Sequence, residues 1–140
     1  MQVKKRLDYQ APTFTIDNLN LAFDLAPDAT HVTSQLTISR IDPNASDELV
    51  LDGHDLALIS ILLDGVTLDE SQYDLSDNNL IVRRLPACCT LTIVTKIEPQ
   101  SNTALEGLYF ASDTFCTQCE AEGFRRITYY LDRPDVLSVF

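Results

Sequence analysis

The sequence predicts an all-β domain, either an antiparallel β-sandwich or a curved open sheet, with one short helix near the C-terminus. Apolar and polar residues alternate over short runs, which is the period of strands with one buried face. Turn-forming residues interrupt these runs at close spacing and leave room for about eight short strands. Among the 140 residues, the stretch 122–131 is the one place where helix competes with strand.

The first two strands are expected to form a long hairpin. Alternation runs through residues 14–25, and its phase slips at Asp17 and Asn18. A slip of one residue moves side chains to the other face unless the strand bulges, so a bulge or bend is predicted there. The turn-forming run 27–30 follows, and alternation resumes over residues 32–38.

The middle of the chain predicts shorter strands. Residues 42–46 form a loop, and Leu49 and Leu51 indicate a short strand after it. The Ile- and Leu-rich run 56–63 ends at Asp64-Gly65, a strong hairpin signal, so Val66 and Leu68 are expected on the returning strand.

Two more strands complete the expected sheets. The turn 77–79 precedes a strand at residues 80–82, and Pro99 closes a strand over about residues 90–98. A short helix within residues 122–131 must end before Pro134, because the residue preceding a proline avoids the helical region. We find no internal repeat and no linker, so residues 1–140 are interpreted as one domain.

Charge excludes one class of partner and permits another. The formal net charge is −11, from 21 acidic and 10 basic residues. Nucleic-acid binding depends on Lys and Arg that neutralise phosphates, so it is not expected. A cationic partner such as a peptide amine is compatible with this charge, although solubility alone is the better explanation.

No membrane partner is expected either. The longest apolar run, residues 56–63, is too short to span a bilayer, and no apolar leader follows the basic start of the chain. These features predict a cytoplasmic protein.

Four cysteines raise the possibility of a structural zinc site or a redox motif. Cys116 and Cys119 form a C-x-x-C, while Cys88 and Cys89 are adjacent. Adjacent residues of a strand point to opposite faces, so Cys88 and Cys89 are poorly placed to hold one ion, and Cys89 is expected in the core. A redox C-x-x-C normally lies near a βαβ unit, whereas this sequence predicts an all-β pattern.

Residues 102–135 differ from the rest of the chain, because polar and charged side chains crowd there between aromatic ones. Within this region Gln118 and Glu120 are two apart, so on an extended segment they would face the same side. A carboxylate and an amide on one face can hold an ammonium group. The spacing alone fits a solvated strand end better.

Three runs of this region carry a resemblance to a known family: NTALEGLY at 102–109, CTQCEAEGFR at 116–125 and YYLDRPD at 129–135. Weaker matches lie at residues 8–12, 23–25 and 32–34. Together they resemble the N-terminal domain of the aminopeptidase N family of zinc metallo-aminopeptidases, in its bacterial branch. That family removes N-terminal residues from peptides, with a zinc-activated water attacking the scissile carbonyl.

The resemblance implies that Gln118 and Glu120 are substrate-binding residues, lining the pocket for the first substrate residue, and that Glu120 binds the free amine. It also implies a cis peptide bond after Glu120. The family's H-E-x-x-H and G-x-M-E-N signatures are absent, and His31 and His54 are too far apart for one zinc motif. No catalytic residue or metal ligand is therefore expected in this chain.

The expectation for residues 1–140 is the N-terminal β domain of a longer enzyme, cut before its catalytic domain and before this domain ends. Zinc would belong to the full-length enzyme and not to this piece, which alone should be inactive. Its partners would be a peptide N-terminus and the missing catalytic domain. The alternatives are a non-catalytic β-sandwich interaction module and, third, a structural-zinc or redox cysteine domain.

Overall fold

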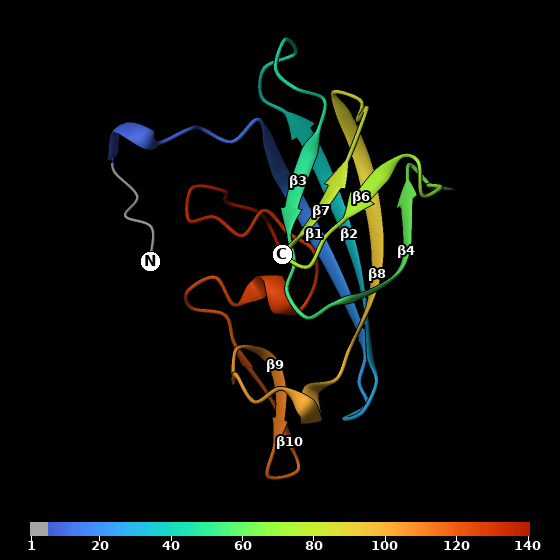
Figure 1. The fold of residues 1–140 in the computed structure, drawn as a ribbon, viewed down its shortest axis with the longest axis vertical. Coiled ribbons are helices and arrows are strands. Elements are labelled where there is room, and N and C mark those ends of the chain that lie inside the picture. The colour runs from blue at the N-terminus through green and yellow to red at the C-terminus, as the bar shows by residue number, and fades with distance from the viewer. Residues whose placement is uncertain (1–5) are drawn as a thin grey trace.

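The computed structural model describes residues 6–140, which form ten strands in three antiparallel sheets (Figure 1). The largest sheet has the strand order β1-β2-β8-β4-β5. Its strands are β1 (Phe14–Asp24), β2 (Thr30–Arg40), β4 (Ala57–Leu63), β5 (Val66–Thr67) and β8 (Cys88–Ile97). The second sheet contains β3 (Leu49–Asp52), β6 (Tyr73–Leu75) and β7 (Asn79–Val82), and the third contains β9 (Gly107–Ala111) and β10 (Thr114–Gln118).

The predicted hairpin of β1 and β2 is confirmed, including its bulge. The pairing register shifts between Ile16 and Asn18, so Asp17 is the extra residue. This bulge keeps both Ile16 and Leu19 in the core although their spacing is odd. At the other end, the buried Thr30 hydroxyl donates to the carbonyl of Ala26 at 2.7 Å and closes the turn.

The predicted hairpin at Asp64-Gly65 is also confirmed. Both residues have positive φ, 49° and 81°, which matches the tight turn whose twist suits a two-residue hairpin. Leu62 pairs with Thr67 and Leu63 with Val66 across this turn.

The core lies between the five-stranded sheet and the sheet of β3, β7 and β6, which faces it in Figure 1. Alternate residues of β2 and β8 are buried, as period-two strands require. They meet the buried leucines and valine of β3 and β7, namely Leu49, Leu51, Leu80 and Val82. The all-β sandwich prediction is therefore confirmed.

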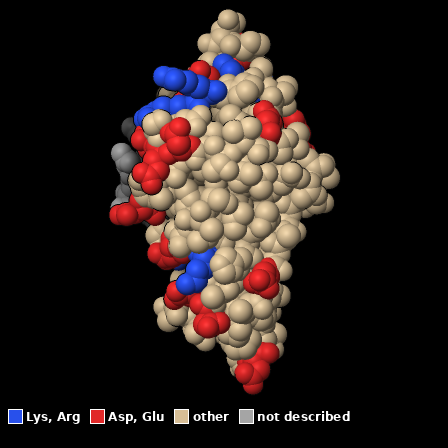
Figure 2. Space-filling view, turned by 90° about the vertical axis from the view of Figure 1, so that its right-hand side faces the viewer, with Lys and Arg blue, Asp and Glu red and all other residues tan. Residues whose placement is uncertain are grey.

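The opposite side of the five-stranded sheet carries few charges. The non-core side chains of β2 and β8 are mostly hydroxyl, amide or small groups: Thr33, Gln35, Thr37, Ser39, Thr90, Thr92 and Val94. Figure 2 views the molecule from the side of β4 and β8, and the middle of that face shows neither acidic nor basic side chains. The acidic excess of the chain is therefore not spread evenly over its surface.

The predicted C-terminal helix is a single 3₁₀ turn, η3 (Phe124–Arg126). The chain cannot continue as a helix because Tyr130 pairs with Asp52 of β3, exchanging backbone hydrogen bonds of 2.7 and 3.0 Å. Phe124 is held edge-on against Tyr130, with ring centroids 4.9 Å apart. In the described part of the chain, no helix is long and apolar enough to cross a membrane.

Gly53 lies where β3 meets this C-terminal segment, and its lack of a side chain is required there. A Cβ atom at residue 53 would overlap the ring of Tyr129, which is buried in the core. We expect Gly53→Ala to lower the free energy of unfolding by about 1–3 kcal/mol, the usual cost of overpacking. Thermal or urea unfolding would measure it. Gly65→Asn, at an open turn position that tolerates asparagine, is the matched control. Equal stability of the native and Gly53→Ala proteins would contradict this account.

Asp135 gives a pH-dependent contact near the N-terminal segment. Hydrogen bonds from Arg133, 2.7 and 2.9 Å long, lower the pKa of Asp135 to about 2. A carboxyl with a lowered pKa stabilises the fold above its unfolded pKa of about 3.9, and that contribution disappears as the pH falls towards 2. Arg133→Ala should return this pKa towards about 3.9. NMR titration of the carboxyl would check it, and a pKa that stays near 2 would refute the assigned cause.

Candidate functional site

The hairpin of β9 and β10 and the turn after it present the two predicted site residues. Gln118 is the last residue of β10 and pairs with Gly107, whereas Glu120 lies in the turn beyond the strand. Glu120 therefore does not share an extended segment with Gln118, because the strand ends at Gln118. The turn brings them together instead: Gln118 Nε2 donates to the backbone carbonyl of Glu120 at 3.1 Å.

Glu120 is an exposed carboxylate with no bonding partner among residues 6–140. Its acidic neighbours differ. Glu122 lies 3.6 Å from Arg125, and Asp132 lies 3.0 Å from the same guanidinium. The Glu120 side chain is therefore the acidic group of this turn that is available to a ligand. The peptide bond between Glu120 and Ala121 is cis, as the resemblance implied.

Two glycines let the turn pack closely. The backbone N–H of Gly123 donates to the carbonyl of Cys119 at 2.9 Å, and a Cβ at residue 123 would lie 2.6 Å from the carbonyl oxygen of Gln118. Gly107 has a φ of +71°, and a Cβ there would lie 2.7 Å from Cβ of Arg126. Larger residues at either position would move the turn that carries Glu120.

Ion pairs fasten η3, which follows the turn. Burial opposes the charge of Arg125, but its bond to Asp132 and the nearby acidic groups outweigh this and raise its pKa. Arg126 bridges Glu106 at 3.2 Å and Asp55 at 2.6 Å. Arg125, Arg126 and Asp132 therefore have a structural role beside the turn.

Buried hydroxyl groups join the same segment to the five-stranded sheet. Thr128 and Ser34 of β2 share a hydrogen bond of 2.8 Å, and Thr95 of β8 donates to the carbonyl of Ile127 at 3.3 Å. Unpaired buried polar groups are costly, so each of these hydroxyls favours one position of the segment. The segment that follows the turn is therefore held in place against β2 and β8.

The cysteines do not assemble a metal site. Cys89 is buried in the core, where desolvation raises the pKa of its thiol to about 11. Burial also raises the pKa of Cys119, which disfavours its reactive thiolate. All four cysteines are free, and residues 6–140 contain no group of three or more His, Cys, Asp or Glu side chains arranged to hold a metal ion.

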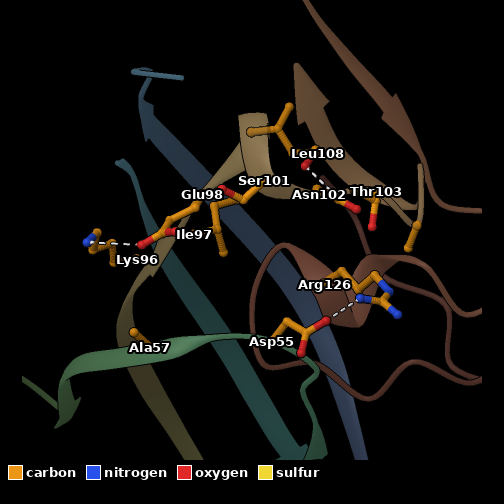
Figure 3. Close-up of a pocket in the computed structure, with 11 residues that line it drawn as sticks. Asp55, Ala57, Lys96, Ile97, Glu98, Ser101, Asn102, Thr103, Leu108 and Arg126 are labelled. Atoms are coloured by element: carbon orange, nitrogen blue, oxygen red, sulfur yellow. Dashed lines mark hydrogen bonds and ion pairs between the residues drawn. The ribbon is translucent and has the colours of Figure 1, made fainter. Parts of the chain in front are cut away.

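A pocket of about 360 Å³ lies between the start of β4, the end of β8 and the loop before β9 (Figure 3). Asp55 and Arg126 form one wall, and Asn102 holds the loop by donating to the carbonyls of Glu106 and Leu108 at 2.7 and 3.0 Å. Gln118 and Glu120 do not line it. Sequence reasoning missed this pocket, because Asp55 and Arg126 are 71 residues apart and no local pattern predicts their contact.

Comparison with known proteins shows which family has this domain. The model of the Peptidase M1 N-terminal domain matches residues 9–140. Aminopeptidase N of Escherichia coli is 46% identical over 142 aligned residues, which cover 99% of this chain and 16% of that protein. The chain thus spans about one sixth of the length of this curated relative.

Solved structures agree on the fold. Aminopeptidase A of Legionella pneumophila, solved in complex with aspartic acid, superposes with a TM-score of 0.89 at 30% identity, covering 96% of this chain and 16% of that chain. An M1 zinc metallopeptidase from Deinococcus radiodurans, as an E323A mutant bound to a Tyr-Ser-Ala substrate, gives a TM-score of 0.73 at 15% identity, covering 90% of this chain and 31% of that one. The match over residues 9–140 and this fold of three antiparallel sheets identify the chain as a member of the Peptidase M1 N-terminal domain family.

Proposed function

We propose that this domain belongs to a zinc-dependent aminopeptidase and binds the free amine of a peptide substrate through Glu120, with Gln118 beside it. The observation that carries the proposal is an exposed carboxylate, without a partner in the described residues, on a turn fastened by ion pairs and buried hydroxyls. Family membership supports it, because the relatives are named as aminopeptidases.

Charge and geometry explain how such a site would select its substrate. A peptide N-terminus carries an ammonium group with three N–H donors, and Glu120 and Gln118 offer acceptor oxygens. A hydrogen bond to a charged group contributes about 1.5–3 kcal/mol. A peptide with an acetylated N-terminus would lose this contribution, so the contact favours removal of terminal residues over internal cleavage.

The residues of this chain do not fit the zinc that the family implies. His31 is exposed on β2 and His54 bonds Asn78 at 3.0 Å, and the described residues offer no cluster of ligands. We therefore assign the metal, its ligands and the general base to a catalytic domain outside this sequence. On this proposal, residues 1–140 supply part of the substrate site and have no peptidase activity alone.

A second candidate is a β-sandwich interaction module without a role in catalysis. The broad uncharged face of the five-stranded sheet is the observation that favours it, because interface cores are depleted in charged residues. This candidate gives no reason for an acidic side chain to stand unpaired on the turn at 119–123, so we place it second.

Glu120→Gln in the full-length protein tests the first candidate directly. The variant keeps the shape of the side chain and removes its charge. We expect KM for peptides with a free amine to rise about 10- to 100-fold, since a charge-assisted bond of about 1.5–3 kcal/mol is weakened. Steady-state kinetics would measure the change.

Glu122→Gln is the matched control for that experiment. It removes the same charge two residues away, from a side chain that lies 3.6 Å from Arg125. Exposed ion pairs contribute at most about 1 kcal/mol, so KM should change little. Equal effects of the two substitutions would show that general charge, and not Glu120, governs substrate binding.

Metal content separates the full-length protein from this domain. We expect about one zinc per chain in the full-length protein, with peptidase activity lost on chelation and restored by zinc. The domain of residues 1–140 should contain no stoichiometric zinc by elemental analysis. Stoichiometric zinc held by Cys116 and Cys119 in the isolated domain would instead favour a structural-zinc module.

A further inference from the structure

The side-chain amide of Gln118 forms one hydrogen bond within the protein, through its nitrogen. Its Nε2 donates to the backbone carbonyl of Glu120 at 3.1 Å. Within the part of the chain that the structure describes, no other donor reaches that carbonyl. The oxygen Oε1 shares a carbon atom with Nε2, so the bond that holds the nitrogen also sets the direction of the oxygen.

The direction of the Glu120 carboxylate depends on this backbone. The side chain forms no hydrogen bond or ion pair among residues 6–140, so the backbone of the turn sets its direction. Two hydrogen bonds close the turn: the one from Gly123 to Cys119, at 2.9 Å, and the one from Gln118 to Glu120. Only the second one holds the peptide unit of Glu120 itself.

We infer that Gln118 is a positioning residue, whose amide nitrogen holds the turn so that the Glu120 carboxylate stands where a substrate amine can reach it. This inference rests on the proposed function and assigns Gln118 a role in addition to accepting from the amine through Oε1. Glutamine suits the role because it combines a donor with the length to reach two residues along the chain. Asparagine is one methylene shorter, and an ionised glutamate has no donor.

The substitution Gln118→Glu distinguishes positioning from direct contact. It preserves size and an acceptor oxygen, adds a negative charge, and removes the donor. If Gln118 acted only by accepting from the substrate ammonium, Gln118→Glu would leave KM unchanged or lower it. If Gln118 holds the turn, the new carboxylate repels the Glu120 carbonyl, and KM for a free-amine peptide should rise about three- to tenfold with little change in kcat.

A double-mutant cycle in the full-length protein tests the route of this effect. The four proteins are the native protein, Gln118→Glu, Glu120→Gln and the double variant. A residue that acts through Glu120 loses its influence once the Glu120 charge is gone, so Gln118→Glu should change KM less than about twofold in the Glu120→Gln background. The same rise in KM in both backgrounds would overturn the inference.

Two further variants serve as a second test and as a control. Gln118→Asn, which is too short to reach the carbonyl, should raise KM like Gln118→Glu, whereas Thr117→Ser on the neighbouring strand position should not. Both site residues are exposed, so melting temperatures should stay within a few degrees of the native value. An unchanged KM in Gln118→Asn would count against positioning.

The cycle also distinguishes amine binding by Glu120 from positioning by Gln118. If Glu120→Gln leaves KM unchanged, the proposed function fails and the inference fails with it. If Glu120→Gln raises KM but Gln118→Glu does not, Glu120 still binds the amine and only the positioning role of Gln118 is refuted.

Discussion

The attachment of residues 127–130 to the two large sheets is the constraint on which the candidate site depends. Backbone hydrogen bonds join Tyr130 to Asp52, and the Thr128 hydroxyl meets Ser34 inside the protein. Hydroxyls buried without partners would cost about 1–3 kcal/mol each, so the segment has one satisfactory position. The 3₁₀ turn and the Glu120 turn precede this anchor directly, and their freedom is limited by it.

Much of the scaffold could be predicted from local pattern. The bulge at Asp17 followed from the slipped alternation of β1, and the β4–β5 hairpin followed from Asp64-Gly65. Both are decided by residues adjacent in sequence, which is why sequence reasoning reached them. Strand β6, Tyr73–Leu75, escaped detection because three residues, two of them exposed, give no measurable alternation.

The site was harder to predict, because its geometry depends on contacts distant in sequence. The spacing of Gln118 and Glu120 would place them on one side of an extended segment, but β10 ends at Gln118 and a turn brings the two residues together. The two residues are therefore neighbours because of a turn and not because of strand geometry. The pocket beside Arg126 shows the same limit, since its wall joins residues 55 and 126 through tertiary folding alone. The roles of Gln118 and Glu120 themselves remain predictions.

The division between a buried anchor and an exposed turn bears on how such domains diverge. The groups that anchor the segment after the turn point inward, towards Ser34, Thr95 and the backbone of β3, whereas the side chains of Glu120 and Ala121 face solvent. Exchange of the outward residues therefore leaves the supporting contacts untouched. Paralogues could acquire different ligand preferences on an unchanged backbone, without passing through poorly folded intermediates.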